Sequence, residues 1–101
     1  MKTLKKFSQE ETKRLRNIIE CTDKEFVLFN TIKLNEEAGE ICNEILKHFK
    51  CARKNKLEQA QELGSEIADV VIVASILAES MNIDLEKALN DKIQKIEKRY
   101  N

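Results

Sequence analysis

The residues of this sequence best suited to chemistry are two groups of acidic side chains. Glu36, Glu37 and Glu40 form the first group, and 25 residues separate Glu40 from the second group, which is Glu66 and Asp69. Two carboxylates three residues apart on a helix lie about 5–6 Å from each other. Burying ionised carboxylates without compensation costs on the order of several kcal/mol each. Where such a pair lies beside apolar residues, it therefore predicts either a bound cation or protonated acids.

The second acid group begins the most apolar stretch of the chain, residues 63–81. Between Val70 and Ala78 the only polar residue is Ser75. A helix that is apolar on nearly every side cannot face water, so this stretch predicts a helix in the middle of a bundle. At 100° per residue, both acids fall on a strip that becomes apolar further along the helix. Their carboxylates are therefore expected at a buried surface.

The first acid group lies on a second long predicted helix, which begins near Asp23 and ends near His48 or Lys50. On a helical wheel Glu37 lies at the border of the buried arc, Glu40 lies slightly further out and Glu36 points away from the core. Acids often flank amphipathic helices simply because they are solvated there. Taken alone, this helix is explained better by a solvated border than by a site.

Pairing the two helices changes this interpretation. If they pack antiparallel, four carboxylates converge: those of Glu37, Glu40, Glu66 and Asp69. Four carboxylates without a counter-ion repel one another, whereas a divalent cation turns them into a site. Oxygen-only ligation favours a hard ion, Mg²⁺ with Mn²⁺ as the alternative, over zinc.

Cations recur on the last predicted helix, from Leu85 to Arg99. Lys92 falls in the middle of the apolar stripe of this helix, Arg99 falls close to the stripe, and Lys95 lies further round. One explanation is that their aliphatic stems cover the core while the charged heads reach water. The other is that these side chains point into the acid site and bind phosphates. The spacing leaves both explanations open.

The composition predicts an all-α, four-helix bundle-like fold in one domain. The chain has no proline and two glycines, and strong helix formers dominate it. Helices are expected at about 9–20, 23–50, 57–81 and 85–99. Ser8 with Glu11 and Thr22 with Glu25 have the spacing of N-terminal capping boxes. Within the single domain of residues 1–101, residues 1–22 are expected to form an outer supporting helix and residues 23–101 the core with the metal site.

Composition also bears on partners and location. Charged residues make up 36% of the chain but balance to a formal net charge of zero, which does not favour nucleic-acid binding. Three cysteines without C-x-x-C spacing indicate reduced thiols of a cytoplasmic protein. No apolar run is long enough for a signal peptide or a bilayer span, so no membrane association is expected. Three short neighbours can hardly cover the apolar helix, which predicts a homodimer or homotetramer that shares this core.

The acid groups also resemble a known family. EEAGE at Glu36 to Glu40 and EIAD at Glu66 to Asp69 are similar to the E-E-x-x-E and E-x-x-D motifs of the MazG-like nucleotide pyrophosphohydrolases. The apolar run that follows and the ending K-x-x-K-x-x-x-R-Y also resemble the family. The resemblance implies a helical fold, a tight dimer or tetramer, and Mg²⁺ bound by the acids at positions 37, 40, 66 and 69. It also implies hydrolysis of a nucleoside triphosphate to the monophosphate and pyrophosphate. The family often has an asparagine near the phosphates, where this chain has Ile93 and Ile96.

The expected function is therefore Mg²⁺-dependent hydrolysis of a ribo- or deoxynucleoside triphosphate, in a house-cleaning or pool-control role. Either Glu36 or Glu40 would activate the attacking water, and Lys92, Lys95 and Arg99 would hold the polyphosphate. The alternatives are a non-catalytic helical dimerisation module and a nucleotide-binding relative that has lost catalysis. Base and sugar preference, and dimer against tetramer, stay open at this level.

Overall fold

A computed structural model describes the backbone of residues 1–50 and 56–100 of this chain. The described residues form helices and contain no strand, so the prediction of an all-α fold is confirmed. The elements in chain order are α1 (Leu4–Ile18), α2 (Asp23–Lys50), α3 (Lys56–Ser80), α4 (Leu85–Glu97) and the short 3₁₀ turn η1 (Lys98–Tyr100). The predicted break between the two long helices falls mainly on residues outside the described ranges.

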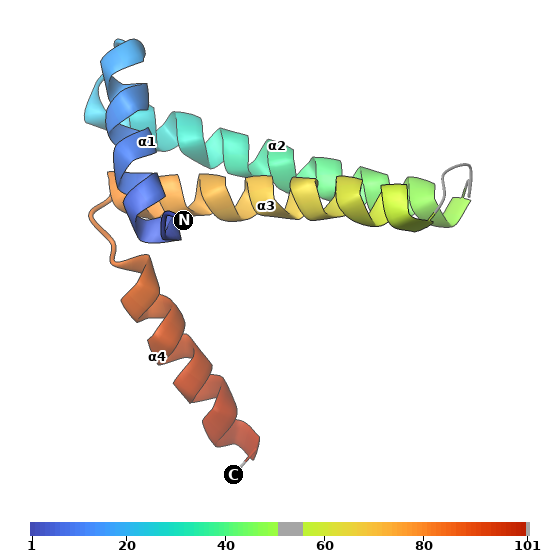
Figure 1. The fold of residues 1–101 in the computed structure, drawn as a ribbon. Helices are drawn as coiled ribbons and strands as arrows, with labels where there is room; N and C mark the ends of the chain where they lie inside the picture. The colour runs from blue at the N-terminus through green and yellow to red at the C-terminus, as the bar shows by residue number, and fades with distance from the viewer. Residues whose placement is uncertain (51–55, 101) are drawn as a thin grey trace.

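The two long helices, α2 and α3, lie side by side as an antiparallel hairpin (Figure 1). α1 crosses one end of this hairpin, where α2 begins and α3 ends, and packs against α3. α4 leaves from the same end and leads away from the hairpin. This arrangement brings the facing strips of α2 and α3 together over their whole length, and so it is the hairpin that positions the acids.

The core lies where α1, α2 and α3 meet. Phe26 of α2 is buried there together with Val73, Ile76 and Ala78 of α3. Ser75 is buried as well, and its hydroxyl donates to the carbonyl of Ile72 at 2.7 Å, which satisfies the one polar group of this apolar run. No helix in the described parts of the chain combines the length and apolar character needed to cross a bilayer.

Burial of α3 is incomplete within one chain. The helix was expected to be covered on nearly every side, yet Ile67 and Val71 remain about half exposed. Two neighbouring helices cover only part of the circumference of α3, because α4 contributes little contact to it. The uncovered apolar side is consistent with the prediction that a single chain is too small to bury this helix.

α1 begins earlier than its sequence pattern suggested. Its N-cap is Thr3, whose hydroxyl accepts a backbone N–H from the first turn at 3.1 Å. The predicted capping box of Ser8 and Glu11 is therefore wrong. Ser8 lies buried inside the helix and its hydroxyl donates to the carbonyl of Lys5. The helix extends to Leu4 because Thr3 supplies an equivalent cap more than a turn upstream.

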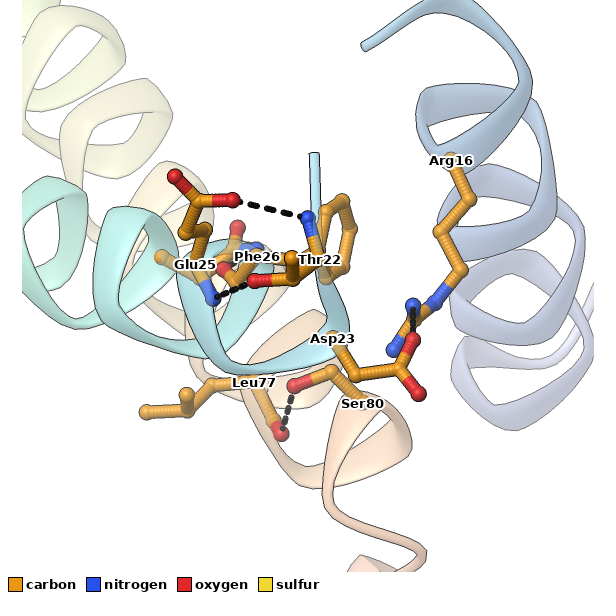
Figure 2. A network of polar contacts seen from close by, with 8 residues as sticks. Arg16, Thr22, Asp23, Glu25, Phe26, Leu77 and Ser80 are labelled. Carbon is orange, nitrogen blue, oxygen red and sulfur yellow. Dashed lines mark hydrogen bonds and ion pairs between the residues drawn. The ribbon is translucent and has the colours of Figure 1, made fainter. Parts of the chain in front are cut away.

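The corner between α1 and α2 is held by a network of polar contacts (Figure 2). The predicted capping box is present: the backbone N–H of Glu25 donates to the Thr22 hydroxyl at 3.1 Å, and the backbone N–H of Thr22 donates to the Glu25 carboxylate at 2.9 Å. Arg16 of α1 pairs with Asp23 and stacks 4.5 Å above the ring of Phe26. The network ties the start of the hairpin to α1.

The joint between α3 and α4 is a Schellman turn. Asn82 has a left-handed backbone with φ of 56°, and its N–H bonds to the carbonyl of Glu79 at 3.1 Å. The N–H of Ile83 bonds to the carbonyl of Ala78 at 2.9 Å, which completes the motif. Asp84 then caps α4 by accepting the backbone N–H of Lys87. These contacts confirm the predicted end of α3 and fix where α4 starts.

Candidate metal centre

Three carboxylates converge from the facing strips of α2 and α3. Glu37 and Glu40 of α2 and Glu66 of α3 each place one oxygen within 4.8 Å of the others. Glu37 and Glu66 are partly buried, and Glu40 is exposed. Because the helices run antiparallel, the i, i+3 pair on α2 meets the start of the acidic strip on α3. The cluster is therefore half enclosed by the hairpin and open on one side.

One carboxylate oxygen of Glu66 has no hydrogen-bond partner among the described residues. Its Oε2 atom is shut off from water and has no hydrogen-bond donor within the described structure. Burial raises the pKa of the Glu66 carboxyl, and the neighbouring carboxylates of Glu40, Asp69, Glu44 and Glu62 raise it further. A buried acceptor without a donor is rare in folded proteins and calls for a bound ion, a water or a proton.

Glu37 is perturbed in the same direction. Burial raises the pKa of its carboxyl, Glu40 and Asp69 raise it further, and Lys33 opposes them. Among the described residues, no lysine or arginine forms an ion pair with Glu37, Glu40 or Glu66. Within residues 1–50 and 56–100, therefore, no ion pair neutralises the negative charge of the cluster.

Asp69 and two further acids surround this cluster. Asp69 is not one of the three converging acids, but its charge raises the pKa of both Glu37 and Glu66. Glu44 and Glu62, one helical turn beyond Glu40 and before Glu66, were not predicted as site residues. The i, i+4 spacing of each with a predicted ligand is the sequence signal that could have found them.

The donor set fits a hard divalent cation. Every converging ligand atom is a carboxylate oxygen, and the cluster includes no nitrogen or sulfur donor. Mg²⁺ and Mn²⁺ prefer such oxygen ligands, and Mg²⁺ retains several waters, which the open side of the cluster allows. The unpartnered Oε2 of Glu66 provides an acceptor for such an ion.

The remaining predicted site residues lie apart from this cluster. Glu36 is exposed and is not one of the converging acids. Lys92 and Lys95 lie on α4 and Arg99 lies on η1; all three are exposed, and their helix leads away from the hairpin (Figure 1). Within a single chain, the structure therefore joins the acids of α2 and α3 but does not bring the α4 cations to them.

One of three comparisons with known proteins found a match. The sequence pattern of the MazG nucleotide pyrophosphohydrolase domain matches residues 28–101, a range that contains both acid groups and α4. A search of curated proteins and a search of solved structures each returned no match. The match begins within α2, so α1 lies outside it. With a match over most of its length and paired acids on an antiparallel helical hairpin, the chain belongs to the MazG nucleotide pyrophosphohydrolase family.

Proposed function

We propose that this protein hydrolyses a ribo- or deoxynucleoside triphosphate to the monophosphate and pyrophosphate, with Mg²⁺ or Mn²⁺ as the cofactor and a house-cleaning or pool-control role in the cytoplasm. The observation that carries the proposal is the convergence of Glu37, Glu40 and Glu66, with no ion pair to any of them among the described residues. Family membership supports nucleotide pyrophosphohydrolase chemistry for such a cluster.

Four acids are proposed to hold the ion: Glu37, Glu40, Glu66 and Asp69. When bound, Mg²⁺ supplies neutralisation of the charge on the phosphate oxygens. The role of the chain is to hold these four carboxylates in place before substrate arrives. Opposing strips on two rigid helices suit this role, because a site built on helices is held more firmly than one on loops.

The water-activating residue is proposed to be Glu40, with Glu36 as the alternative. Glu40 has a carboxylate in the cluster and is open to solvent, whereas Glu36 is exposed outside it. A base must lie within hydrogen-bond reach of the proton that it accepts. Glu40 would take the proton of a water that attacks the α-phosphorus, the bond to the bridging oxygen would break, and pyrophosphate would leave.

Lys92, Lys95 and Arg99 are proposed to hold the polyphosphate. Since α4 leads away from its own hairpin, these cations reach an acid cluster only if a second chain packs so that its α4 lies over the first. The proposal therefore includes a homodimer or homotetramer in which the acids come from one chain and the cations come from another.

A Mg²⁺ titration followed by thermal unfolding, together with a panel of ribo- and deoxynucleoside triphosphates assayed for pyrophosphate release, tests the proposal. We expect Mg²⁺ to raise the melting temperature, because an ion that binds only the folded state stabilises it. Glu66→Gln should lower pyrophosphate release by about 100-fold or more, the size of effect of losing one group that stabilises transition-state charge. Glu20→Gln removes an exposed acid far from the cluster and serves as the matched control.

Each other outcome points to a different function. Full activity of Glu66→Gln would show that the metal assignment is wrong. A Mg²⁺ shift without pyrophosphate release from any triphosphate would indicate a nucleotide-binding relative without catalysis. If Mg²⁺ and a non-hydrolysable triphosphate leave the melting temperature unchanged, the acids are a solvated border and the chain is a helical dimerisation module.

A further inference from the structure

A cavity of about 480 Å³ is lined by residues of α1, α3, α4 and the turn between α3 and α4, the region where α4 leaves the hairpin (Figure 1). Ser8 of α1 and both Ser75 and Glu79 of α3 are polar residues of its wall, and Leu4 of α1 and Leu89 of α4 are apolar ones. Small-molecule sites commonly have volumes of about 300–1,000 Å³ and combine apolar walls with a few polar groups. The cavity has the size and the mixed lining of such a site.

The buried hydroxyls of the wall have no proton left for a ligand. Ser8 and Ser75 are buried; the Ser8 hydroxyl donates to the carbonyl of Lys5 at 2.9 Å, and the Ser75 hydroxyl donates to the carbonyl of Ile72 at 2.7 Å. Because a hydroxyl has one proton and two lone pairs, both oxygens can only accept from a ligand. Glu79 lies one turn beyond Ser75 on the same face of α3, and its carboxylate also accepts. A ligand that satisfies all three groups must bring donors.

The charge of the lining favours a cation. Carboxylates of Glu79, Asp84 and Glu86 line the cavity, against the single ammonium group of Lys5. The first turns of α1 and α4 also line it, and each helix N-terminus carries about half a positive unit charge, so the balance is about one negative charge. Glu79 is partly buried and forms no ion pair among the described residues. This balance disfavours a nucleotide or pyrophosphate, which separates the cavity from the substrate of the proposed reaction.

We propose that this cavity binds a small organic ammonium ion with an apolar body, such as an alkylamine. A protonated primary amine has three N–H donors, and Ser8, Ser75 and Glu79 supply three acceptors. The aliphatic chain lies against Leu4 and Leu89, which are 38% and 50% exposed, so binding removes apolar surface from water. The inference goes beyond the proposed hydrolysis and does not depend on it, because no residue of the cavity wall is one of the converging acids.

Titration of the full chain with hexylamine, followed by amide chemical shifts in ¹H–¹⁵N NMR spectra, tests the site without nucleotide or Mg²⁺. Hexylamine is protonated at pH 7.5, as lysine is. Hexan-1-ol and hexanoate are probes of similar length that lack the positive charge. We expect saturable shifts at residues 3–8 and 75–89. Hexylamine should bind at least about 10-fold more tightly than either other probe, because only hexylamine makes charge-assisted hydrogen bonds to the acceptors of the wall.

Glu79→Gln keeps the size of the side chain and removes its charge. This variant should bind hexylamine at least about 10-fold more weakly than wild-type protein, with hexan-1-ol binding unchanged. Glu97→Gln is the matched control, since Glu97 is an exposed acid of α4 outside the cavity lining. It should bind hexylamine as wild-type protein does.

The comparison of the three probes uses wild-type protein alone, so the test holds even if the Glu79 variant does not fold. Four results would each overturn the proposal: no saturable hexylamine binding; hexan-1-ol or hexanoate binding as tight as that of hexylamine; shifts centred on residues 37–69, where the acid cluster lies; or an equal loss of affinity in Glu97→Gln.

Discussion

At the scale of single residues, the unpartnered Oε2 of Glu66 is expected to affect the stability of the metal-free protein. The pKa of this carboxyl is raised by burial and by the acids around it. A raised carboxyl pKa contributes stability that is complete below the ordinary value and is lost as pH rises through the folded value. Near neutral pH, therefore, we expect the metal-free cluster to lower the free energy of unfolding.

Glu66→Gln should raise the melting temperature of the metal-free protein at pH 7.5 and have a smaller effect at pH 5. The amide cannot ionise, so the repulsion from Glu40 and Asp69 disappears. Thermal unfolding in EDTA at both pH values measures the effect. Each comparison is made at one pH, because Glu10, Glu11 and Glu25 have lowered pKa values and lose their stabilising contributions as pH falls. A less stable variant at pH 7.5 would contradict the interpretation.

When Mg²⁺ is added at pH 7.5, the wild-type protein should have a higher melting temperature than Glu66→Gln, the reverse of the order in EDTA. Wild-type protein gains stability in proportion to ion binding, whereas Glu66→Gln gains less because one ligand has lost its charge. The crossing of the two melting temperatures separates a metal site from a merely strained acidic patch, which would favour the glutamine variant under both conditions.

The convergence of Glu37, Glu40 and Glu66 could be predicted from sequence, because a period of 3.6 residues places each acid on its helix face. A helical wheel does not predict the register between α2 and α3. Register decides that the tightest group holds three acids with Asp69 beside it, and that Glu44 and Glu62 also approach. Sequence spacing within one helix contains no information about how far the partner helix slides.

At the scale of the helices, the cap at the start of α2 supports the hairpin. Thr22→Ala removes the hydroxyl that accepts the backbone N–H of Glu25. We expect a loss of about 1 kcal/mol in the free energy of unfolding, the usual cost of losing such a cap. Urea denaturation measures it. Thr31→Ala is the control, since Thr31 lies inside α2 with its hydroxyl bonded back to Val27, and alanine there should be neutral or stabilising. Equal losses for both would contradict a capping role.

Gly39 offers a second prediction on α2. Apart from the adjoining residues and the nearby backbone of α2 itself, no described atom lies within 4 Å of the Cβ that an alanine would add. Gly39→Ala should therefore raise the free energy of unfolding by about 0.5–1 kcal/mol through helix propensity alone, as measured by urea denaturation. A destabilised variant would show that something outside this chain packs against α2 at Gly39.

The start of a helix was predicted correctly where the sequence offers a single candidate capping residue. Thr22 caps α2 as expected. At α1 two hydroxyls compete, and the sequence favours Ser8 because Glu11 follows it at the right spacing. The earlier cap at Thr3 prevails, and the turn that it adds places Leu4 against the cavity. Tertiary contact of this kind is not visible in a capping motif.

At the scale of the whole molecule, a shared core makes stability depend on protein concentration. If copies of the chain cover each other's exposed apolar side chains, unfolding includes dissociation, and mass action raises the melting temperature as protein concentration rises. We expect a clear increase over a hundredfold range of concentration, measured by circular dichroism. A melting temperature independent of concentration would contradict the oligomer in any geometry.

The class of the fold could be inferred from the sequence, because composition is intrinsic to the chain. The need for a partner stays a prediction. The direction of α4 could not be inferred from the sequence. Its stripe of Leu89, Ile93 and Ile96 fits equally well against its own hairpin or against another, and only the backbone of the joint decides between them.

That joint has a consequence for recognition. The left-handed backbone of Asn82 and the two bonds of the Schellman turn give α4 its angle from contacts within α3 and the turn itself. Because the turn fixes the direction of α4 before any binding, α4 loses little conformational entropy when it binds a partner. More of the free energy of the contacts then contributes to affinity. The angle at which α4 would meet a partner is thus set within one chain, by Ala78, Glu79, Asn82 and Ile83.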